Sequence, residues 1–283
     1  MTKAIATAAR TREILNTYDL HAKKGYGQNF LVDLSVAARC AEAGCLDSAV
    51  IEVGPGIGSL TEQLAQRSRK VLAFEVDERL RPVLQETLQA YDNVEVVFQD
   101  VLTADLKTTV PELKRQYGSV TVCANLPYYI TSPVLFRFFE CGPDISLITV
   151  MVQKEVADRF SAAPNSKDYG ALSVEAQYLY MVKKLFNVPR GCFNPSPNVD
   201  SAIVQFQAKP QADLAIDTAG FFDLVQGAFK QRRKTLYNNL KEYTGSAEQA
   251  LNLLHEAGIG EQARAQELGT EEMIRLYRCY RGM

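Results

Sequence analysis

The chain has 283 residues, of which 47% are hydrophobic and 23% charged, and its formal net charge is −2. This is an ordinary globular composition, and the length suits one large domain or a large domain with a small one. No apolar run approaches a membrane-spanning length, and residues 1–25 contain no apolar stretch long enough for a signal peptide. We therefore expect a soluble, cytoplasmic protein.

The first 25 residues are basic and amphipathic, which is also typical of transit peptides. They contain Glu13 and Asp19, and acidic residues favour an ordinary N-terminal helix over a transit peptide. A second helix is predicted from Asp33, a good N-cap, to Gly44.

Strand and helix patterns alternate from about residue 48 to 150. Short apolar runs predict the strands, and apolar residues at helical spacing predict the helices between them. The strands are expected at 48–54, 70–77, 93–100, 119–126 and 145–152, with helices at 59–69 and 78–91. Strands that alternate with helices imply parallel βαβ units and a doubly wound sheet.

The pattern changes after residue 170. Residues 171–188 and 198–209 are predicted as strands that close the sheet as an antiparallel hairpin. Helices are predicted beyond a short linker, at 221–230, 246–258 and 270–280. The predicted fold class is α/β, with a Rossmann-like domain at 1–210, including an N-terminal helical extension, and a small all-helical domain at 211–283.

The six cysteines form no CxxC pair and no regular framework, and the chain has only two histidines. A zinc site is therefore not expected, and no metal is predicted. Reduced, buried thiols are the favoured interpretation.

A glycine-rich loop, "IEVGPGIGSL", lies between a predicted strand and a predicted helix. Gly54 and Gly56 allow a tight turn and close backbone approach to a ligand, although a purely structural turn fits the same pattern. The next strand ends with Glu75 and Asp77, where a carboxylate can accept hydrogen bonds from ribose hydroxyls. Together they indicate a nucleoside cofactor. The GxGxG spacing, with Glu52 before it, resembles the motif of S-adenosylmethionine methyltransferases more than a dinucleotide loop.

The third strand ends at Asp100, which can accept a hydrogen bond from an adenine amino group. The alternative is a surface carboxylate or a helix N-cap. Three successive strands that end in suitable residues favour the cofactor site.

The fourth strand ends in the "NLPYY" loop, which should lie beside the glycine loop. Methyl transfer to an adenine amino nitrogen requires acceptors for its N–H groups, because its lone pair is delocalised into the ring. The Asn125 side-chain oxygen and the Leu126 carbonyl are suited to that task. Pro127 stiffens the loop, and Tyr128 can stack on an extruded base. The alternative is a turn with two packed tyrosines.

Basic residues are concentrated in two segments despite the negative net charge. Such local clusters set the field that a phosphate backbone meets. They are Lys23 and Lys24 near the N-terminus, and Lys230, Arg232, Arg233 and Lys234 in "FKQRRKTLYNNLK". In the second segment a single helix is expected, with Val225, Phe229, Leu236 and Leu240 on its apolar face. A solvated basic face is the alternative to RNA contact.

Ordered segments spread over nearly the whole chain resemble the KsgA/RsmA family of small-subunit (16S) rRNA adenine N6,N6-dimethyltransferases. They are "GQNFL", "IEVGPGIGSLTEQL", "FEVD", "QDVL", "NLPYYI", "QKEVADR", "YGALSV", "FNPSPNVDSAIV" and "QRRKTLYNNL". Many methyltransferases share the glycine loop, whereas the full set is specific to this family.

The resemblance implies the roles of individual residues. The cofactor, S-adenosylmethionine with S-adenosylhomocysteine as its product, would contact Gln28, Asn29, Leu31, Gly54, Gly56, Glu75, Asp100 and Asn125. The catalytic set would be Asn125, Leu126, Pro127, Tyr128 and Phe193. Phe193 would be the second aromatic face of a sandwich around the target adenine, and we expect it to be exposed, although a core position is the alternative.

The implied substrate is a pair of adjacent adenosines in the 3′-terminal hairpin of 16S rRNA, within the assembling small ribosomal subunit. A monomer is expected, and its helical domain would contact rRNA or the subunit. Three alternatives remain open: a large-subunit rRNA methyltransferase of the antibiotic-resistance type, a DNA adenine methyltransferase, and a non-catalytic RNA-binding assembly factor.

Overall fold

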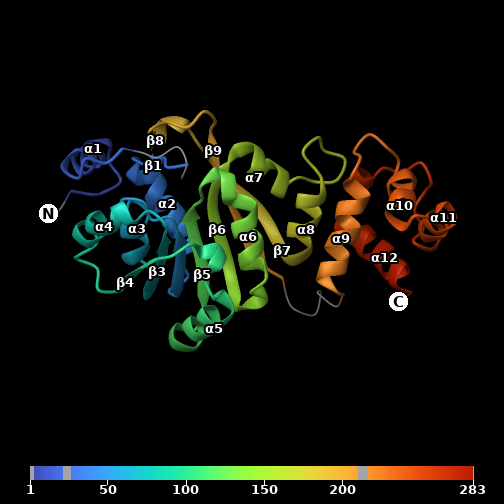
Figure 1. The fold of residues 1–283 in the computed structure, drawn as a ribbon, viewed down its shortest axis with the longest axis horizontal. Coiled ribbons are helices and arrows are strands. Elements are labelled where there is room, and N and C mark those ends of the chain that lie inside the picture. Colours follow the sequence, from blue (N-terminus) through green and yellow to red (C-terminus); the bar gives the residue numbers. More distant parts are fainter. Residues whose placement is uncertain (1–2, 22–26, 210–215, 283) are drawn as a thin grey trace. The chain divides into compact units, whose positions relative to one another are not determined.

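A computed structural model describes residues 3–21, 27–209 and 216–282 of the chain (Figure 1). The chain divides into two compact units. The α/β unit comprises Met1–Ala157 and Lys183–Ala208, and the helical unit comprises Asp158–Val182 and Lys209–Met283. The domain boundary expected at residue 210 remains a prediction, and the contacts group residues 158–182 with the helical unit.

Seven strands form one sheet in the order β4-β3-β2-β5-β6-β9-β7. The neighbouring pairs among β2 to β6 are parallel, whereas β9 runs antiparallel to β6. The strands are β2 (Ala49–Val53), β3 (Lys70–Glu75), β4 (Val94–Phe98), β5 (Val120–Asn125), β6 (Ile145–Gln153), β7 (Tyr180–Val188) and β9 (Ser201–Ala208). A separate antiparallel pair joins β1 (Phe30–Leu31) to β8 (Phe193–Asn194). The predicted doubly wound sheet is confirmed.

Helices flank this sheet in the α/β unit (Figure 1). The α-helices are α1 (Ala8–Thr17), α2 (Leu34–Gly44), α3 (Thr61–Ala65), α4 (Arg81–Thr87), α5 (Leu106–Tyr117) and α6 (Thr131–Phe139). The short 3-10 helices are η2 (Glu78–Leu80), η3 (Val101–Thr103), η4 (Tyr128–Ile130), η5 (Gly142–Asp144) and η6 (Arg190–Cys192). The helix predicted after Asp33 is confirmed, because the Asp33 carboxylate caps α2 through the backbone N–H groups of Ser35 and Val36.

The helical unit contains six α-helices in its described residues, the first of which begins in the α/β unit. They are α7 (Lys154–Phe160), α8 (Ala171–Leu179), α9 (Thr218–Phe229), α10 (Leu236–Thr244), α11 (Ala247–Glu256) and α12 (Thr270–Arg281), with the 3-10 helix η8 (Ala265–Glu267) before α12. Helices α8 to α12 contribute to one core that includes Tyr178, Phe221, Leu240 and Tyr277. The three C-terminal helices predicted from periodicity are thus present.

One predicted strand is wrong over its first half. Residues 171–179 form helix α8, and only Tyr180–Val188 form a strand. Apolar residues occupy every second position from Leu172 to Tyr180, which fits a strand. Val174 and Tyr178 are also four residues apart, as on one face of a helix, and both belong to the helical core. Strand β9 is present as expected, and β7 lies beside it in the sheet.

The basic segment is not a single helix as expected. Helix α9 ends at Phe229, and α10 begins at Leu236 after Thr235, whose side chain caps it by accepting from the Asn238 N–H. The four basic residues from Lys230 to Lys234 therefore lie in the connecting turn. The buried Asn239 holds this turn: its Nδ2 donates to the carbonyls of Ala228 and Gln231.

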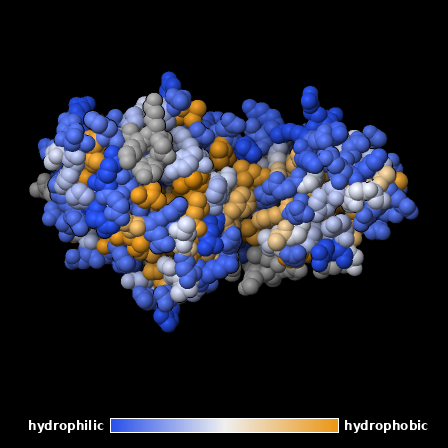
Figure 2. All heavy atoms as spheres, viewed as in Figure 1, coloured by the Kyte–Doolittle hydropathy of each residue, from blue (hydrophilic) through white to orange (hydrophobic). Residues whose placement is uncertain are grey.

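The sheet topology determines where a ligand can bind. From β2 the chain proceeds outward through β3 to β4, and then crosses to the other side of β2 to form β5. A crevice therefore opens beyond the carboxyl ends of β2 and β5, which is where doubly wound sheets bind ligands. In the face shown in Figure 2, apolar side chains form several patches within a largely hydrophilic surface. Across the described residues, no helix is both long and apolar enough to cross a membrane.

Candidate active site

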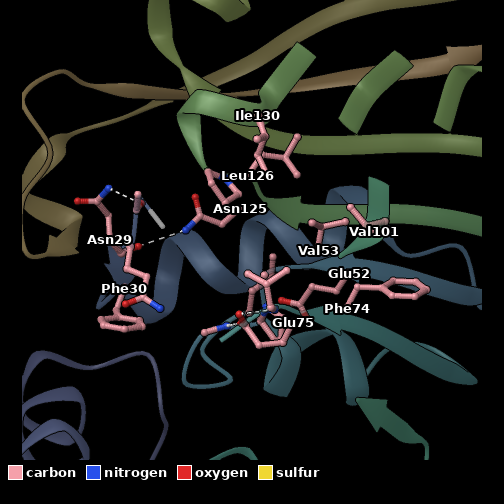
Figure 3. Close-up of a pocket in the computed structure, with 18 of the residues that line it drawn as sticks. Asn29, Phe30, Glu52, Val53, Phe74, Glu75, Val101, Asn125, Leu126 and Ile130 are labelled. Atoms are coloured by element: carbon pink, nitrogen blue, oxygen red, sulfur yellow. Dashed lines mark hydrogen bonds between the residues drawn. The ribbon is translucent and has the colours of Figure 1, made fainter. Parts of the chain in front are cut away.

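A cavity of about 260 Å³ lies at this carboxyl edge (Figure 3). Five segments line it. Four of them end or follow the strands β2 to β5, at 52–60, 74–76, 99–102 and 125–130, and the fifth, 27–31, contains β1. It brings together all the predicted cofactor residues and the predicted catalytic residues other than Phe193. Segments separated by almost a hundred residues thus form one site.

The glycine loop forms the floor of the cavity. Gly54 and Gly56 have φ angles of +68° and +59°, in the left-handed region that favours glycine. A Cβ at Gly56 would lie 3.2 Å from Cδ1 of Phe30, closer than carbon atoms ordinarily approach. The loop therefore requires glycine here for its conformation as well as for space.

Glu75 is buried in the cavity wall with its carboxylate held by the backbone. The N–H of Gly56 donates to Oε2 at 3.3 Å, and those of Val76 and Asp77 donate to Oε1 at 2.8 and 2.9 Å. Burial raises the pKa of Glu75, and these three donors oppose the shift. Asp77 instead pairs with Arg79 and accepts from Gln28. Of these two acids, Glu75 lines the cavity and Asp77 does not, so the predicted ribose contact rests on Glu75.

Glu52 is a second buried acid in the wall, and its Oε2 has no hydrogen-bond partner in the described structure. Burial raises the pKa of Glu52 to about 8, the Thr61 side chain opposes the shift, and the nearby charge of Glu75 adds to it. A buried carboxyl oxygen without a partner is costly, so it is suited to receive a polar or cationic ligand group.

Asp100 is a helix N-cap, as the alternative interpretation of the sequence had it, and its contact with the adenine of the cofactor stays a prediction. One oxygen, Oδ1, accepts from the backbone N–H of Leu102 at 2.9 Å and so caps η3. The residue is also exposed and lines the cavity. The cap fixes the carboxylate at the edge where an adenine amino group would arrive.

The Asn125 side chain is oriented by the "QNFL" segment. Its Nδ2 donates to the Asn29 carbonyl at 3.4 Å, which leaves its oxygen pointing away from that contact (Figure 3). The backbone N–H of Leu126 donates to the Met151 carbonyl at 3.1 Å and ties the loop to β6. The Pro127 carbonyl accepts from Ile130 N–H at 3.2 Å and closes the turn. These three hydrogen bonds tie the loop to its neighbours and close its turn.

The two tyrosines of the loop have different surroundings. Tyr128 is half-buried, and its hydroxyl shares a hydrogen bond of 2.7 Å with Ser201 Oγ. Burial raises the pKa of Tyr128, so the hydroxyl is neutral at ordinary pH. Tyr129 is 58% exposed at the same cavity.

The expected exposure of Phe193 is wrong, because its side chain is only 4% exposed. Phe193 pairs with Leu31 between β8 and β1, and it packs in a core cluster with Val188 and Ile203. It does not line the cavity. Because the chain pairs with β1 at this point, the ring turns inward. Its role beside a bound base remains a prediction.

Two cations in the basic turn of the helical unit have side-chain or backbone partners, and two others are exposed. Lys230 Nζ lies 2.6 Å from Glu242, and Arg232 donates to Gln266 and to the Ser166 carbonyl. Arg233 and Lys234 are exposed. Lys23 and Lys24, also predicted to bind RNA, lie outside the described residues.

The family model for ribosomal RNA adenine dimethylase matches residues 20–281. The chain belongs to this family. The protein is a methyltransferase that uses S-adenosylmethionine.

Relatives in this family match the chain along nearly its full length. A protein of Bacillus licheniformis is 46% identical over 96% of both chains, and one of Oceanobacillus iheyensis is 46% identical over 97% of this chain and 95% of that protein. Both are named ribosomal RNA small subunit methyltransferase A.

Two solved structures have a similar fold. The crystal structure of the 23S rRNA methyltransferase ErmE is 30% identical, covers 88% of this chain and 98% of its own, and has a TM-score of 0.65. That of a dimethyladenosine transferase from Plasmodium falciparum has a TM-score of 0.75, with 89% of this chain and 98% of its own covered. The latter is 24% identical and supports the fold alone.

The residues of the cavity fit the family's cofactor. Glu75 offers fixed acceptors for ribose hydroxyls, and Asp100 offers one for the adenine amino group. The unpartnered Oε2 of Glu52 is suited to the ammonium of the methionine part. Gly54 and Gly56 leave the floor free of side chains. When bound, the cofactor supplies an electrophilic methyl group, and these residues would hold the cofactor in the cavity.

Two residues of the site were not among those predicted. Glu52 appears in the sequence only as part of the glycine motif, and its burial without a partner is a tertiary property. Ser201 lies in the "FNPSPNVDSAIV" segment, and no local pattern connects it to Tyr128, which is 73 residues away.

Proposed function

We propose that this chain transfers methyl groups from S-adenosylmethionine to N6 of two adjacent adenosines in the 3′-terminal hairpin of 16S rRNA, giving N6,N6-dimethyladenosine. The substrate would be the assembling small ribosomal subunit, and the enzyme would act as a cytoplasmic monomer. The names of the relatives that are 46% identical support the small subunit over the large one.

The observation that carries this proposal is the fixed orientation of the Asn125 amide. Because Nδ2 is engaged by Asn29, Oδ1 is available to accept from the adenine N6 amino group. The Leu126 carbonyl belongs to the same stiff loop and offers a second acceptor. Two acceptors draw the amino nitrogen toward a pyramidal geometry, which localises its lone pair for attack and stabilises the positive charge that develops.

No strong base is required in this reaction. The amino nitrogen becomes cationic as it accepts the methyl group. A proton on this cationic nitrogen is far more acidic than an amino proton of neutral adenine, so water can accept it. The neutral Tyr128 ring provides a face on which the extruded base can stack. The structure of the loop is thus consistent with orientation and electrostatic stabilisation as its contributions.

The basic turn is the proposed RNA contact of the helical unit. Arg233 and Lys234 are exposed for phosphates, whereas Lys230 and Arg232 must first exchange their intramolecular partners. We also propose that Lys23 and Lys24 contribute to RNA binding. These contacts carry little sequence information, so the fold of the subunit, and not its base sequence, would be recognised.

The test compares three substrates with cofactor carrying a labelled methyl group: undermethylated small subunits, large subunits and duplex DNA. Label is expected only in the small subunit, as dimethyladenosine at two adjacent positions of 16S rRNA. Label confined to large subunits or DNA would refute the substrate assignment. Subunit binding without any label would favour the non-catalytic assembly factor.

A further inference from the structure

The catalytic loop has a contact with β9 that the proposed chemistry does not use. The Tyr128 hydroxyl and Ser201 Oγ share a hydrogen bond of 2.7 Å, and Ser201 is fully buried. We propose that Ser201 is a positioning residue, whose hydroxyl fixes the plane of the Tyr128 ring against the base that is methylated. This inference rests on the proposed function.

Ser201 is itself held firmly. It begins β9 opposite Gln153 of β6, and the two strands stay in register through Gln207. The preceding residue, Asp200, is tied twice: its carbonyl accepts from Lys154 N–H at 3.0 Å and its carboxylate from Arg190 N–H at 2.9 Å. A group on a paired strand with such neighbours moves less than one on a loop, so it is a suitable anchor.

The Tyr128 side chain needs such an anchor because of its place in the loop. It opens η4, a helix of only three residues with no side-chain cap. The backbone fixes one end of the side chain, but rotation about χ1 and χ2 remains possible. The hydrogen bond at the hydroxyl fixes the other end. Stacking depends on the ring plane, so a free ring would hold a base in many orientations.

The anchor also relates the ring to the acceptors of the amino group. The Leu126 N–H is bonded to Met151 of β6, and β6 is the strand that pairs with β9. Hydrogen bonds to two paired strands therefore hold both groups: the Tyr128 ring is bonded to β9, and the residue that carries the Leu126 carbonyl is bonded to β6. This arrangement keeps the base plane and the acceptors aligned, and alignment is what lowers the barrier for two bound reactants.

The contact also argues that the Tyr128 hydroxyl is not the base of the reaction. Burial raises the pKa of Tyr128, while the bond to Ser201 opposes that shift only in part. A neutral phenol already bonded to a buried serine is poorly placed to take a proton. The hydroxyl then acts only by orienting the ring. Removing the Tyr128 hydroxyl should therefore lower kcat as much as removing the Ser201 hydroxyl does.

A double-mutant cycle in the full-length enzyme tests this equality. The variants are Ser201→Ala, Tyr128→Phe and the two combined, assayed with undermethylated small subunits. Each single variant is expected to lower kcat about tenfold, and the combined variant no further than the worse single one. The Kd of the cofactor and the KM for subunits should stay within about twofold, because binding contacts are retained.

Ser146→Ala is the matched control. Ser146 lies near the opposite end of β6, where its Oγ donates to the Val120 carbonyl at 3.1 Å. This variant loses a comparable hydrogen bond, so it should lose comparable stability in urea but keep its kcat. A Ser201→Ala enzyme with full kcat, or losses that multiply in the combined variant, would overturn the proposal. If the wild type labels large subunits instead, only the proposed substrate fails, and the same cycle is measured on that substrate.

Discussion

The Nδ2 of Asn125 lies 3.4 Å from the carbonyl oxygen of Asn29, across 96 residues of sequence. The contact joins the "QNFL" segment, expected to bind the cofactor, to the loop expected to bind the target base. It determines which end of the amide faces the incoming amino group. If both segments have these expected roles, cofactor binding and base activation would depend on one arrangement of the backbone.

Replacing Asn125 with alanine removes the orientable acceptor while leaving the Leu126 carbonyl in place. We expect kcat to fall by about 10² to 10³, the usual effect of losing one preorganised group that stabilises developing charge. Single-turnover methylation of small subunits under saturating cofactor measures the step directly. A variant with wild-type rates would remove Asn125 from the mechanism.

Glu75→Gln should weaken cofactor binding. The neutral amide loses the charge that receives ribose hydroxyls, and its NH₂ group opposes one of the three backbone N–H donors. We expect the Kd measured by calorimetry to rise about 10- to 100-fold, as for the loss of a hydrogen bond to a charged group. The control is Glu78→Gln, which breaks an exposed ion pair with Arg81 and should leave the Kd unchanged.

Glu52 should make stability depend on pH in the cofactor-free protein. Its pKa is raised from 4.5 to about 8 by burial, so the folded chain keeps a proton that the unfolded chain releases. The stabilisation is complete below about pH 4.5 and is lost as the pH rises through 8. In this window the free energy of unfolding should fall by about 1 kcal/mol per pH unit from this group.

Glu52→Gln mimics the protonated form and cannot ionise, so its urea-unfolding curve should lack this part of the slope. The variant is expected to match the wild type near pH 4.5 and to exceed it in stability at pH 8. Glu75 contributes to both proteins, so the difference between them isolates Glu52. Parallel pH profiles for the two proteins would contradict the raised pKa.

Asn239→Ala should destabilise the helical unit. The buried amide donates to the carbonyls of Ala228 and Gln231 and accepts from the Gln231 N–H. Removing it leaves three backbone groups of the basic turn without this partner, at a cost of about 2 to 4 kcal/mol in urea unfolding. Asn238→Ala, next to it and exposed, should change stability by less than about 1 kcal/mol. Equal losses of stability in the two variants would contradict the role of Asn239 in holding the basic turn.

Much of the fold was predictable because its signals are local. The parallel strands appear as apolar runs, and the Asp33 cap marks the start of α2. Errors occurred where a local pattern fits two structures. The 171–179 segment alternates like a strand yet packs as a helix, and the basic segment has helical periodicity on both sides of a turn. Packing against the helical core accompanies the first outcome, and hydrogen bonds of Asn239 and Thr235 hold the turn in the second.

The residue types at the ends of four strands were readable from local patterns, and the order of the segments indicated the family. Parallel strands place their carboxyl ends together, so Gly54, Glu75, Asp100 and Asn125 had to meet. Three features depended on the tertiary structure: which of Glu75 and Asp77 faces the cavity, the burial of Glu52 Oε2 without a hydrogen bond, and the inward turn of Phe193. The tertiary structure also joined Tyr128 to Ser201. These features depend on burial and on contacts between distant segments, which no local pattern of side chains encodes.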